Sequence, residues 1–226
     1  MTDLENVKRP DGKECPAYVA KPSGSARAGI VVIQEWWGLN DQIKKTADRL
    51  ANEGYLAIVP DLYRGKLATN VDEANHSMAN LDFLDATQQD IRGCVQHLSA
   101  AGASKVAITG FCMGGGLTWH AAAKLAHVVA TAPFYGGGPE MTDEEVAQIK
   151  GPVLAIFGEL DQGVSPEVAN KRAAQMDKAG VQHETIIYPN AQHAFFNDTR
   201  AAYNPEAAAD AWQRVIALFK ETLVNE

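Results

Sequence analysis

Short apolar runs alternate along the chain with segments in which apolar residues recur at helical spacing. The apolar runs contain many β-branched residues and few polar interruptions, which is typical of parallel strands buried on both faces. Strands are expected at residues 29–34, 55–59, 106–109, 128–132 and 153–157, with an alternating strand at 183–188 and a weaker one at 17–21.

Helix signals fall between these strands. Asn40 or Asp41 can cap a helix that ends at Gly54, and Ser165-Pro166-Glu167 opens another that ends at Gly180. Further helices are expected at 72–80, 84–100, after residue 112, near 143–149 and from 204 onward. The inward stripe expected of the last helix consists of Ala208, Trp212, Val215, Ile216, Phe219 and Leu223.

This alternation predicts an α/β fold with a mainly parallel, doubly wound sheet flanked by helices. No internal repeat or linker interrupts the 226 residues, so a single domain over 1–226 is expected. Residues 62–83 are the least regular stretch and are interpreted as a mobile cap over a site. Sites in such sheets lie at the carboxyl ends of the strands.

Charge and cysteine content limit the partners. The formal charge of −8 argues against nucleic acid or an anionic membrane, because both require clustered Lys and Arg. Cys15, Cys94 and Cys112 have no zinc-type spacing, so no metal or other cofactor is expected, and their odd number suggests a reducing compartment. Without a signal peptide or a long apolar stretch, we expect a cytoplasmic monomer or small homo-oligomer.

The glycine-rich turn after the strand at 106–109 carries the most specific chemistry. Gly110 and Gly114 lie two positions either side of Cys112. A sharp strand-to-helix turn pushes the central side chain outward and crowds the flanking positions, which glycine tolerates. The helix start would favour a thiolate at Cys112, so this residue is the expected nucleophile.

A buried, inert core cysteine is the competing interpretation of Cys112. A nucleotide-binding loop is disfavoured, because the chain has no G-x-G-x-x-G or G-x-x-x-x-G-K-[ST] pattern.

A thiol nucleophile needs a base and a group that orients the base. Asp161 follows the strand at 153–157, and His193 follows the strand at 183–188. The order Cys112, Asp161, His193 is that of α/β-hydrolases, with cysteine in place of serine. Glu159 is the alternative acid, but Asp161 lies deeper in its loop, where a turn-forming Asp is at home. The other histidines have surface or packing roles as alternatives: His97, His120 and His127 in predicted helices, His183 in a strand and His76 in the cap.

Acyl transfer also requires donors for the developing oxyanion. The N–H of Met113 is one candidate, and the N–H of Trp36, in the loop after the first buried strand, is the other. Trp36 and Trp37 are adjacent and cannot both point the same way, so at least one is expected to line the pocket.

Together these segments resemble the dienelactone hydrolase (carboxymethylenebutenolidase) family, whose α/β-hydrolase fold the chain is therefore expected to share. The segments that carry the resemblance are Gln34-Glu35-Trp36-Trp37-Gly38-Leu39, Pro60-Asp61-Leu62-Tyr63, Gly110-Phe111-Cys112-Met113-Gly114-Gly115, Pro133-Phe134-Tyr135-Gly136, Phe157-Gly158-Glu159-Leu160-Asp161 and His193-Ala194-Phe195.

The resemblance implies a Cys-His-Asp triad that opens enol-lactones such as dienelactone. It also implies that Glu35 holds the resting cysteine as a neutral thiol until substrate displaces it, which would limit oxidation of the idle nucleophile. Tyr135 would form a polar wall of the pocket beside Trp37. The family binds a substrate carboxylate through arginines, and Arg200 and Arg64 are the candidates here, at spacings that match loosely.

Three alternatives remain open at this point. The substrate could be another small-molecule ester or lactone, making the chain a broader carboxylesterase. The same fold could serve a redox sensor or binding protein in which Cys112 is oxidised reversibly, although such a role does not need Asp161 and His193. A peptidase-like activity is the third.

Overall fold

The computed structural model describes residues 4–26 and 28–224, and its strands form one eight-stranded sheet. The order across the sheet is β1-β2-β4-β3-β5-β6-β7-β8. The strands are β1 (Glu5–Lys8), β2 (Glu14–Ala20), β3 (Gly29–Ile33), β4 (Leu56–Pro60), β5 (Val106–Phe111), β6 (Val128–Phe134), β7 (Val153–Gly158) and β8 (His183–Tyr188). The helices are α1 (Asp41–Asn52), α2 (Val71–Ala79), α3 (Phe83–Asp85), the π-helical η1 (Ala86–Ile91), α4 (Arg92–Ala100), α5 (Met113–Lys124), α6 (Asp143–Val146), α7 (Pro166–Ala179) and α8 (Pro205–Val224).

The sheet is mainly parallel, as predicted. β3 to β8 pair in parallel, whereas at one edge β1 pairs antiparallel with β2 and β2 pairs antiparallel with β4. The sequence analysis missed β1, which has four residues and buries only Val7, too little for an apolar pattern to reveal. It also began β2 too late, because the polar Glu14 and the proline at position 16 obscure the start of that strand.

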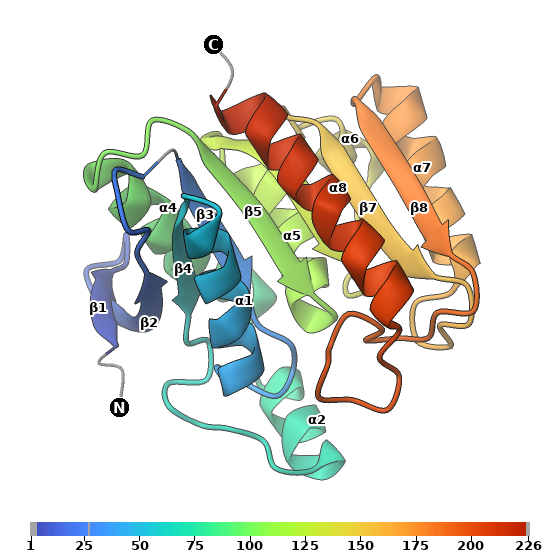
Figure 1. Ribbon diagram of the computed structural model, residues 1–226, viewed down its shortest axis with the longest axis horizontal. Coiled ribbons are helices and arrows are strands. Elements are labelled where there is room, and N and C mark those ends of the chain that lie inside the picture. The colour runs from blue at the N-terminus through green and yellow to red at the C-terminus, as the bar shows by residue number, and fades with distance from the viewer. Residues whose placement is uncertain (1–3, 27, 225–226) are drawn as a thin grey trace.

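Helices cover both faces of the sheet (Figure 1). One core cluster packs α1 and α8 against the sheet, with Leu50 and Phe219 among its fully buried side chains. On the opposite face, Leu98 of α4 and Leu117 of α5 belong to a second cluster, and a third lies under α6 and α7. The doubly wound arrangement that the sequence predicts is therefore confirmed, and both faces of the central strands are buried.

Most predicted helix boundaries are confirmed within a residue or two. Asn40 caps α1 by accepting the N–H of Ile43, and Gly180 ends α7 in the left-handed conformation. The segment 84–100 differs: it is not one α-helix but the succession α3, η1 and α4. The inward stripe predicted for α8 is confirmed, with Trp212 and Ile216 partly buried but packed against the same core cluster as the others.

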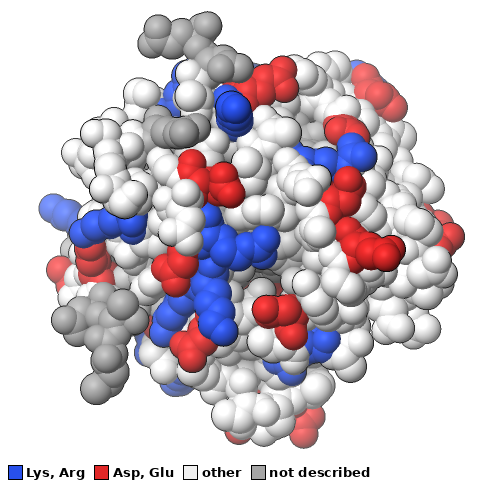
Figure 2. All heavy atoms as spheres, in the orientation of Figure 1, with Lys and Arg blue, Asp and Glu red and all other residues white. Residues whose placement is uncertain are grey.

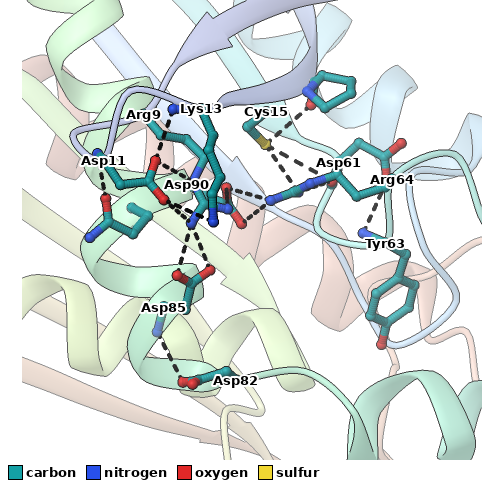
Figure 3. A network of polar contacts seen from close by, with 12 residues as sticks. Arg9, Asp11, Lys13, Cys15, Asp61, Tyr63, Arg64, Asp82, Asp85 and Asp90 are labelled. Atoms are coloured by element: carbon teal, nitrogen blue, oxygen red, sulfur yellow. Dashed lines mark hydrogen bonds and ion pairs between the residues drawn. The ribbon is translucent and has the colours of Figure 1, made fainter.

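A buried network of ion pairs joins the N-terminal hairpin to η1 and to the loop after β4 (Figure 3). Asp90 of η1 accepts two hydrogen bonds from Arg64, at 2.7 and 2.9 Å, and also pairs with Arg9 at 3.2 Å. Arg9 in turn donates to Asp85 and Asp11. Because Asp90 and Arg9 are both buried, each charge depends on its partners for compensation. The network thus fixes the loop after β4, part of the region interpreted as a cap.

Charges on the molecular surface are mixed in sign. On the face shown in Figure 2, Lys and Arg side chains are flanked by Asp and Glu rather than forming an uninterrupted basic patch. Over the described part of the chain, no helix combines the length and apolar character that crossing a membrane requires.

Candidate active site

The turn between β5 and α5 places Cys112 in a strained conformation. Its φ of 56° and ψ of −116° lie outside the regions that non-glycine residues usually occupy. A Cβ at Gly110 would collide with the carbonyl of Gly114, and a Cβ at Gly114 would collide with the carbonyls of Ile33 and Gln34. The expected crowding on both sides of Cys112 is therefore present, and it also brings the end of β3 against the start of α5.

Cys112 lies at the N-terminal end of α5, where unpaired N–H groups and the helix dipole favour negative charge. Its side chain is partly exposed, whereas the other two cysteines are buried. Met113 is the first residue of α5, so its N–H has no acceptor within the helix. This geometry fits a reactive thiol and not an inert core cysteine.

His193 and Asp161 meet although they lie 32 positions apart in the sequence. Nδ1 of His193 is 2.7 Å from Oδ2 of Asp161, and the other carboxylate oxygen accepts the N–H groups of Gly163 and Val164, both at 2.8 Å. Burial by itself lowers the pKa of His193, but hydrogen bonds with Asp161 and Cys112, and the charges of both, raise it to about 10. Asp161 and His193 are therefore joined directly, and the interaction of the ring with Cys112 shows that the thiol lies beside this pair.

The alternative acid, Glu159, lies elsewhere. Its side chain is exposed and accepts the N–H of Asn190 at 3.0 Å. Asp161 is the carboxylate that contacts His193, as its deeper place in the loop predicts. Among the other histidines, His120 is buried in α5 with its ring against Phe83, whereas His127 lies in a turn and not in the predicted helix.

Glu35 is a buried carboxylate next to this chain of residues. Its Oε2 accepts a 2.8 Å hydrogen bond from Asn197, and its Oε1 accepts one at 3.3 Å from the hydroxyl of Tyr135. Burial raises the pKa of Glu35, and these two hydrogen bonds together with the charges of His193 and Arg200 only partly oppose that rise. Glu35 is therefore a desolvated carboxyl held by two neutral donors, and not a surface acid.

Tyr135 was expected to form a polar wall of the pocket. It is instead fully buried, with a left-handed φ of 36° and its ring centroid 5.0 Å from that of His193. Its hydroxyl donates to Glu35, so Tyr135 is a buried side chain that positions Glu35 and is not part of the pocket surface.

Trp37 and Arg200 come together across the site. The guanidinium carbon of Arg200 lies 3.8 Å from the centroid of the Trp37 ring, and the buried Nε of Arg200 has no hydrogen-bond partner among the described residues. Trp36 packs edge-on against Trp37 and is partly buried. Arg64, the other arginine considered for a substrate carboxylate, instead donates to Asp90 and to the carbonyl of Asp61.

Two side chains at the site were missed by the sequence analysis. Asn197 is completely buried and donates to Glu35, and Tyr63 donates from its hydroxyl to Sδ of Met113 at 3.2 Å. Asn197 lies four positions after His193, which no local pattern marks as significant. Tyr63 falls in the segment 62–83, whose irregular pattern gave no direction for any side chain.

The fold is the α/β-hydrolase fold: helices cover both faces of a mainly parallel sheet, a sharp glycine-flanked turn follows β5, and an acid and a histidine follow β7 and β8. The profile of the dienelactone hydrolase family matches residues 15–223. The chain belongs to that family and is a hydrolase of ester or lactone bonds.

Named relatives agree with this assignment over almost their whole length. "Protein usf" of Aquifex pyrophilus is 35% identical over 223 residues, covering 94% of this chain and 96% of its own. The "Putative carboxymethylenebutenolidase" of Aquifex aeolicus is 34% identical at the same coverage. A solved structure described as a "Putative Dienelactone Hydrolase" from Klebsiella pneumoniae superposes with a TM-score of 0.87 at 28% identity, covering 96% of this chain and 98% of its own.

Proposed function

We propose that the protein hydrolyses a small lactone or ester through a catalytic triad of Cys112, His193 and Asp161, with an enol-lactone of the dienelactone type as the substrate class. The single observation that carries this proposal is the 2.7 Å hydrogen bond between Asp161 and His193, whose ring also interacts with Cys112. The names of the relatives support the lactone, since carboxymethylenebutenolidases are named for that ring.

In the first half of the reaction, the thiolate sulfur of Cys112 attacks the carbonyl carbon. The tetrahedral intermediate collapses and breaks the C–O bond, and the leaving oxygen takes a proton from Nε2 of His193. This nitrogen is free for the task because Nδ1 is held by Asp161. The hydrogen bond with Asp161 and its charge raise the pKa of His193, which helps to keep the ring protonated for this transfer.

In the second half, His193 removes a proton from water, and the resulting hydroxide attacks the thioester. The C–S bond breaks, the acid is released and Cys112 returns as a thiolate. Both tetrahedral intermediates carry an oxyanion, to which the N–H groups of Met113 and Trp36 would donate. The close approach of Gly114 to the carbonyls of Ile33 and Gln34 supports this pairing, because the start of α5 lies against the segment that leads to Trp36.

Glu35 would govern the resting state. A buried carboxyl with a raised pKa can exchange a proton with a thiol that approaches it, so the nucleophile would stay neutral until substrate moves Glu35 aside. Arg200 and Trp37 would hold a substrate carboxylate, since Nε of Arg200 is buried without a partner and the Trp37 ring fixes its plane. Tyr135 contributes by positioning Glu35.

The test compares two substrates and three variants. Wild-type enzyme should hydrolyse both p-nitrophenyl acetate and a carboxylated enol-lactone, and Cys112→Ala should abolish both activities. Arg200→Ala should raise KM for the carboxylated lactone by about tenfold to a hundredfold, as expected for a lost charge-assisted hydrogen bond, while leaving p-nitrophenyl acetate almost unchanged.

Full turnover by Cys112→Ala would contradict the triad. An equal loss on both substrates in Arg200→Ala would contradict the carboxylate role alone. Lys66→Ala, which changes an exposed cation in the loop before α2, serves as the matched control.

A further inference from the structure

A second cavity, of about 240 Å³, lies between the loop at residues 136–138 and helix α7. Cys112, Glu35 and His193 are not among the residues that line it, so it is distinct from the pocket of the nucleophile. Its walls combine glycine backbone, apolar side chains, the amide of Gln175 and three charged residues, which are Lys171, Arg172 and the exposed Glu140.

Arg172 is the unusual group in this cavity. Its guanidinium carbon lies 5.2 Å from the centroid of the Trp119 ring, and its Nη1 donates to Oε1 of Gln175 at 3.1 Å. Within the described residues, no carboxylate lies within 4.0 Å of Arg172, whereas Lys171 pairs with Glu140 at 2.7 Å in an exposed contact. Arg172 is thus a half-buried cation that faces a cavity, and among the described residues the carboxylates whose charge reaches it, Glu140 and Glu145, are not in contact with it.

The rest of the lining indicates what kind of anion would fit. Met141 and Val164 are buried and present apolar surface to the cavity, and Val168 lies at its exposed side. A cation at one side and aliphatic side chains at the other suit a carboxylate attached to a compact apolar group. Inorganic anions would leave the apolar wall in contact with water.

The cavity shares a wall with the triad acid. Gly163 and Val164 line it, and their N–H groups are the two that Asp161 accepts at 2.8 Å. A Cβ added at Gly163 would lie 3.5 Å from Oδ1 of Asp161 and 3.9 Å from Nδ1 of His193. A molecule in the cavity would therefore touch the segment that orients Asp161.

We propose that this cavity binds a small organic carboxylate with a compact apolar body, and that Arg172 is the residue that recognises its charge. The site is separate from the proposed catalytic pocket. Carboxylates are also what ester and lactone hydrolysis releases, so a product or a related acid of this class could reach it, a point that rests on the proposed function.

The binding test uses 4-fluorobenzoate as the probe, observed by ¹⁹F NMR, with the neutral 4-fluorobenzyl alcohol as control. Cys112 is first alkylated with iodoacetamide, so that the catalytic pocket is blocked and the outcome does not depend on activity. We expect saturable binding of the carboxylate, and binding of the alcohol weaker by at least about tenfold, since it lacks the charge that Arg172 pairs with.

Variants then locate the site. Arg172→Gln should weaken binding of the carboxylate by at least about tenfold. Lys171→Gln should weaken it by a smaller factor, and this change is less disruptive to folding because Lys171 is exposed. Arg172→Lys keeps the charge and should retain part of the affinity. Arg214→Gln, a surface arginine paired with Asp210 and Glu184, is the matched control and should bind as wild type does.

Three results would each overturn the proposal: no binding to the alkylated protein, equal binding of the alcohol and the carboxylate, or unchanged affinity in Arg172→Gln with a wild-type circular dichroism spectrum. If Arg172→Gln fails to fold, Lys171→Gln and Arg172→Lys test the proposal in its place. Unchanged affinity for the carboxylate in both variants would contradict recognition of its charge at this site.

Discussion

Asn197 donates a 2.8 Å hydrogen bond from Nδ2 to Oε2 of Glu35, although 162 positions separate the two residues. Both side chains are buried, and Oδ1 of Asn197 is fixed in turn by the N–H and hydroxyl of Thr199. The loop that carries His193 therefore also sets the orientation of Glu35. The amide is neutral, so it holds the carboxylate without supplying the full charge that would keep Glu35 ionised.

Replacing Asn197 should change how Glu35 titrates. Asn197→Leu has similar volume but no donor, so it removes the largest of the contacts that lower the pKa of Glu35, and that pKa should rise further. The rate of Cys112 alkylation depends on pH, and one step of this dependence is expected to follow the titration of Glu35. In Asn197→Leu we expect that step to move to higher pH. Rates with iodoacetamide between pH 4 and pH 10 measure this shift.

The control for this experiment is Thr199→Val, which removes only the hydroxyl that donates to Asn197. Its profile should stay close to wild type. Superimposable profiles for Asn197→Leu and wild type would show that Asn197 has no influence on the resting nucleophile.

Glu35→Gln should stabilise the protein, and more so as pH rises. The pKa of Glu35 is higher in the folded protein than its usual value of 4.5, so the native state binds more protons than the unfolded state above that pH. The contribution of Glu35 to the free energy of unfolding is therefore fully present below pH 4.5 and is lost as the pH rises through the pKa of the folded state. Glutamine has no charge to desolvate: its oxygen can still accept from Asn197, and its NH2 group would donate to the hydroxyl of Tyr135 in place of accepting from it.

Urea unfolding at pH 4.5 and pH 8 checks this prediction. The gain in unfolding free energy from Glu35→Gln should be larger at pH 8, whereas the same change at the exposed Glu221 should have little effect at either pH. A gain that is larger at pH 4.5 would mean that the sign assigned to the Glu35 pKa shift is wrong.

Asp161→Asn should lower kcat/KM by about 10²-fold to 10⁴-fold, the scale seen when the orienting acid of a triad is neutralised. It should also lower the pKa of His193 below about 10, because the hydrogen bond and charge of Asp161 both raise it. Glu159→Gln is the matched control: its amide oxygen can still accept the N–H of Asn190, and activity should stay within about twofold.

Steady-state kinetics give the first effect, and NMR titration of the His193 ring gives the second. Equal losses in the two variants would mean that Asp161 has no special role. Unchanged titration of His193 in Asp161→Asn would mean that their contact does not govern its proton.

The positions of Cys112, Asp161 and His193 at one edge of the sheet could be predicted from the sequence, whereas the buried hydrogen bonds around them could not. Gly110, Cys112 and Gly114 form a local pattern whose cause is steric, and Asp161 and His193 follow recognisable buried strands, so strand order alone brings them to one edge. The Glu35–Asn197 bond depends on how two loops meet, which neither periodicity nor spacing encodes. The same reason hid Tyr63, whose direction is set by a loop that Arg64 and Asp90 tie down (Figure 3).

The helical regions show a similar division. The buried positions Ile91, Val95 and Leu98 follow from apolar spacing, but the π-helical turn η1 does not. That turn contains Asp90, a carboxylate whose burial depends on Arg9 and Arg64 from distant segments. Tertiary ion pairing of this kind leaves no periodic trace in the sequence.

The crowded turn around Cys112 gives the last prediction. Gly114→Ala would place a Cβ against the carbonyls of Ile33 and Gln34, and neither backbone group can move without shifting β3. We expect a loss of about 3 kcal/mol in unfolding free energy, at the upper end of overpacking costs, together with loss of activity as Met113 and Trp36 separate.

Gly24→Ala is the matched control, since no atom lies within 4 Å of a Cβ there. It should leave stability within about 1 kcal/mol of wild type. Thermal and urea unfolding of the two variants, with p-nitrophenyl acetate turnover measured alongside, decide the matter: an active, fully stable Gly114→Ala would show that the turn is not constrained as described.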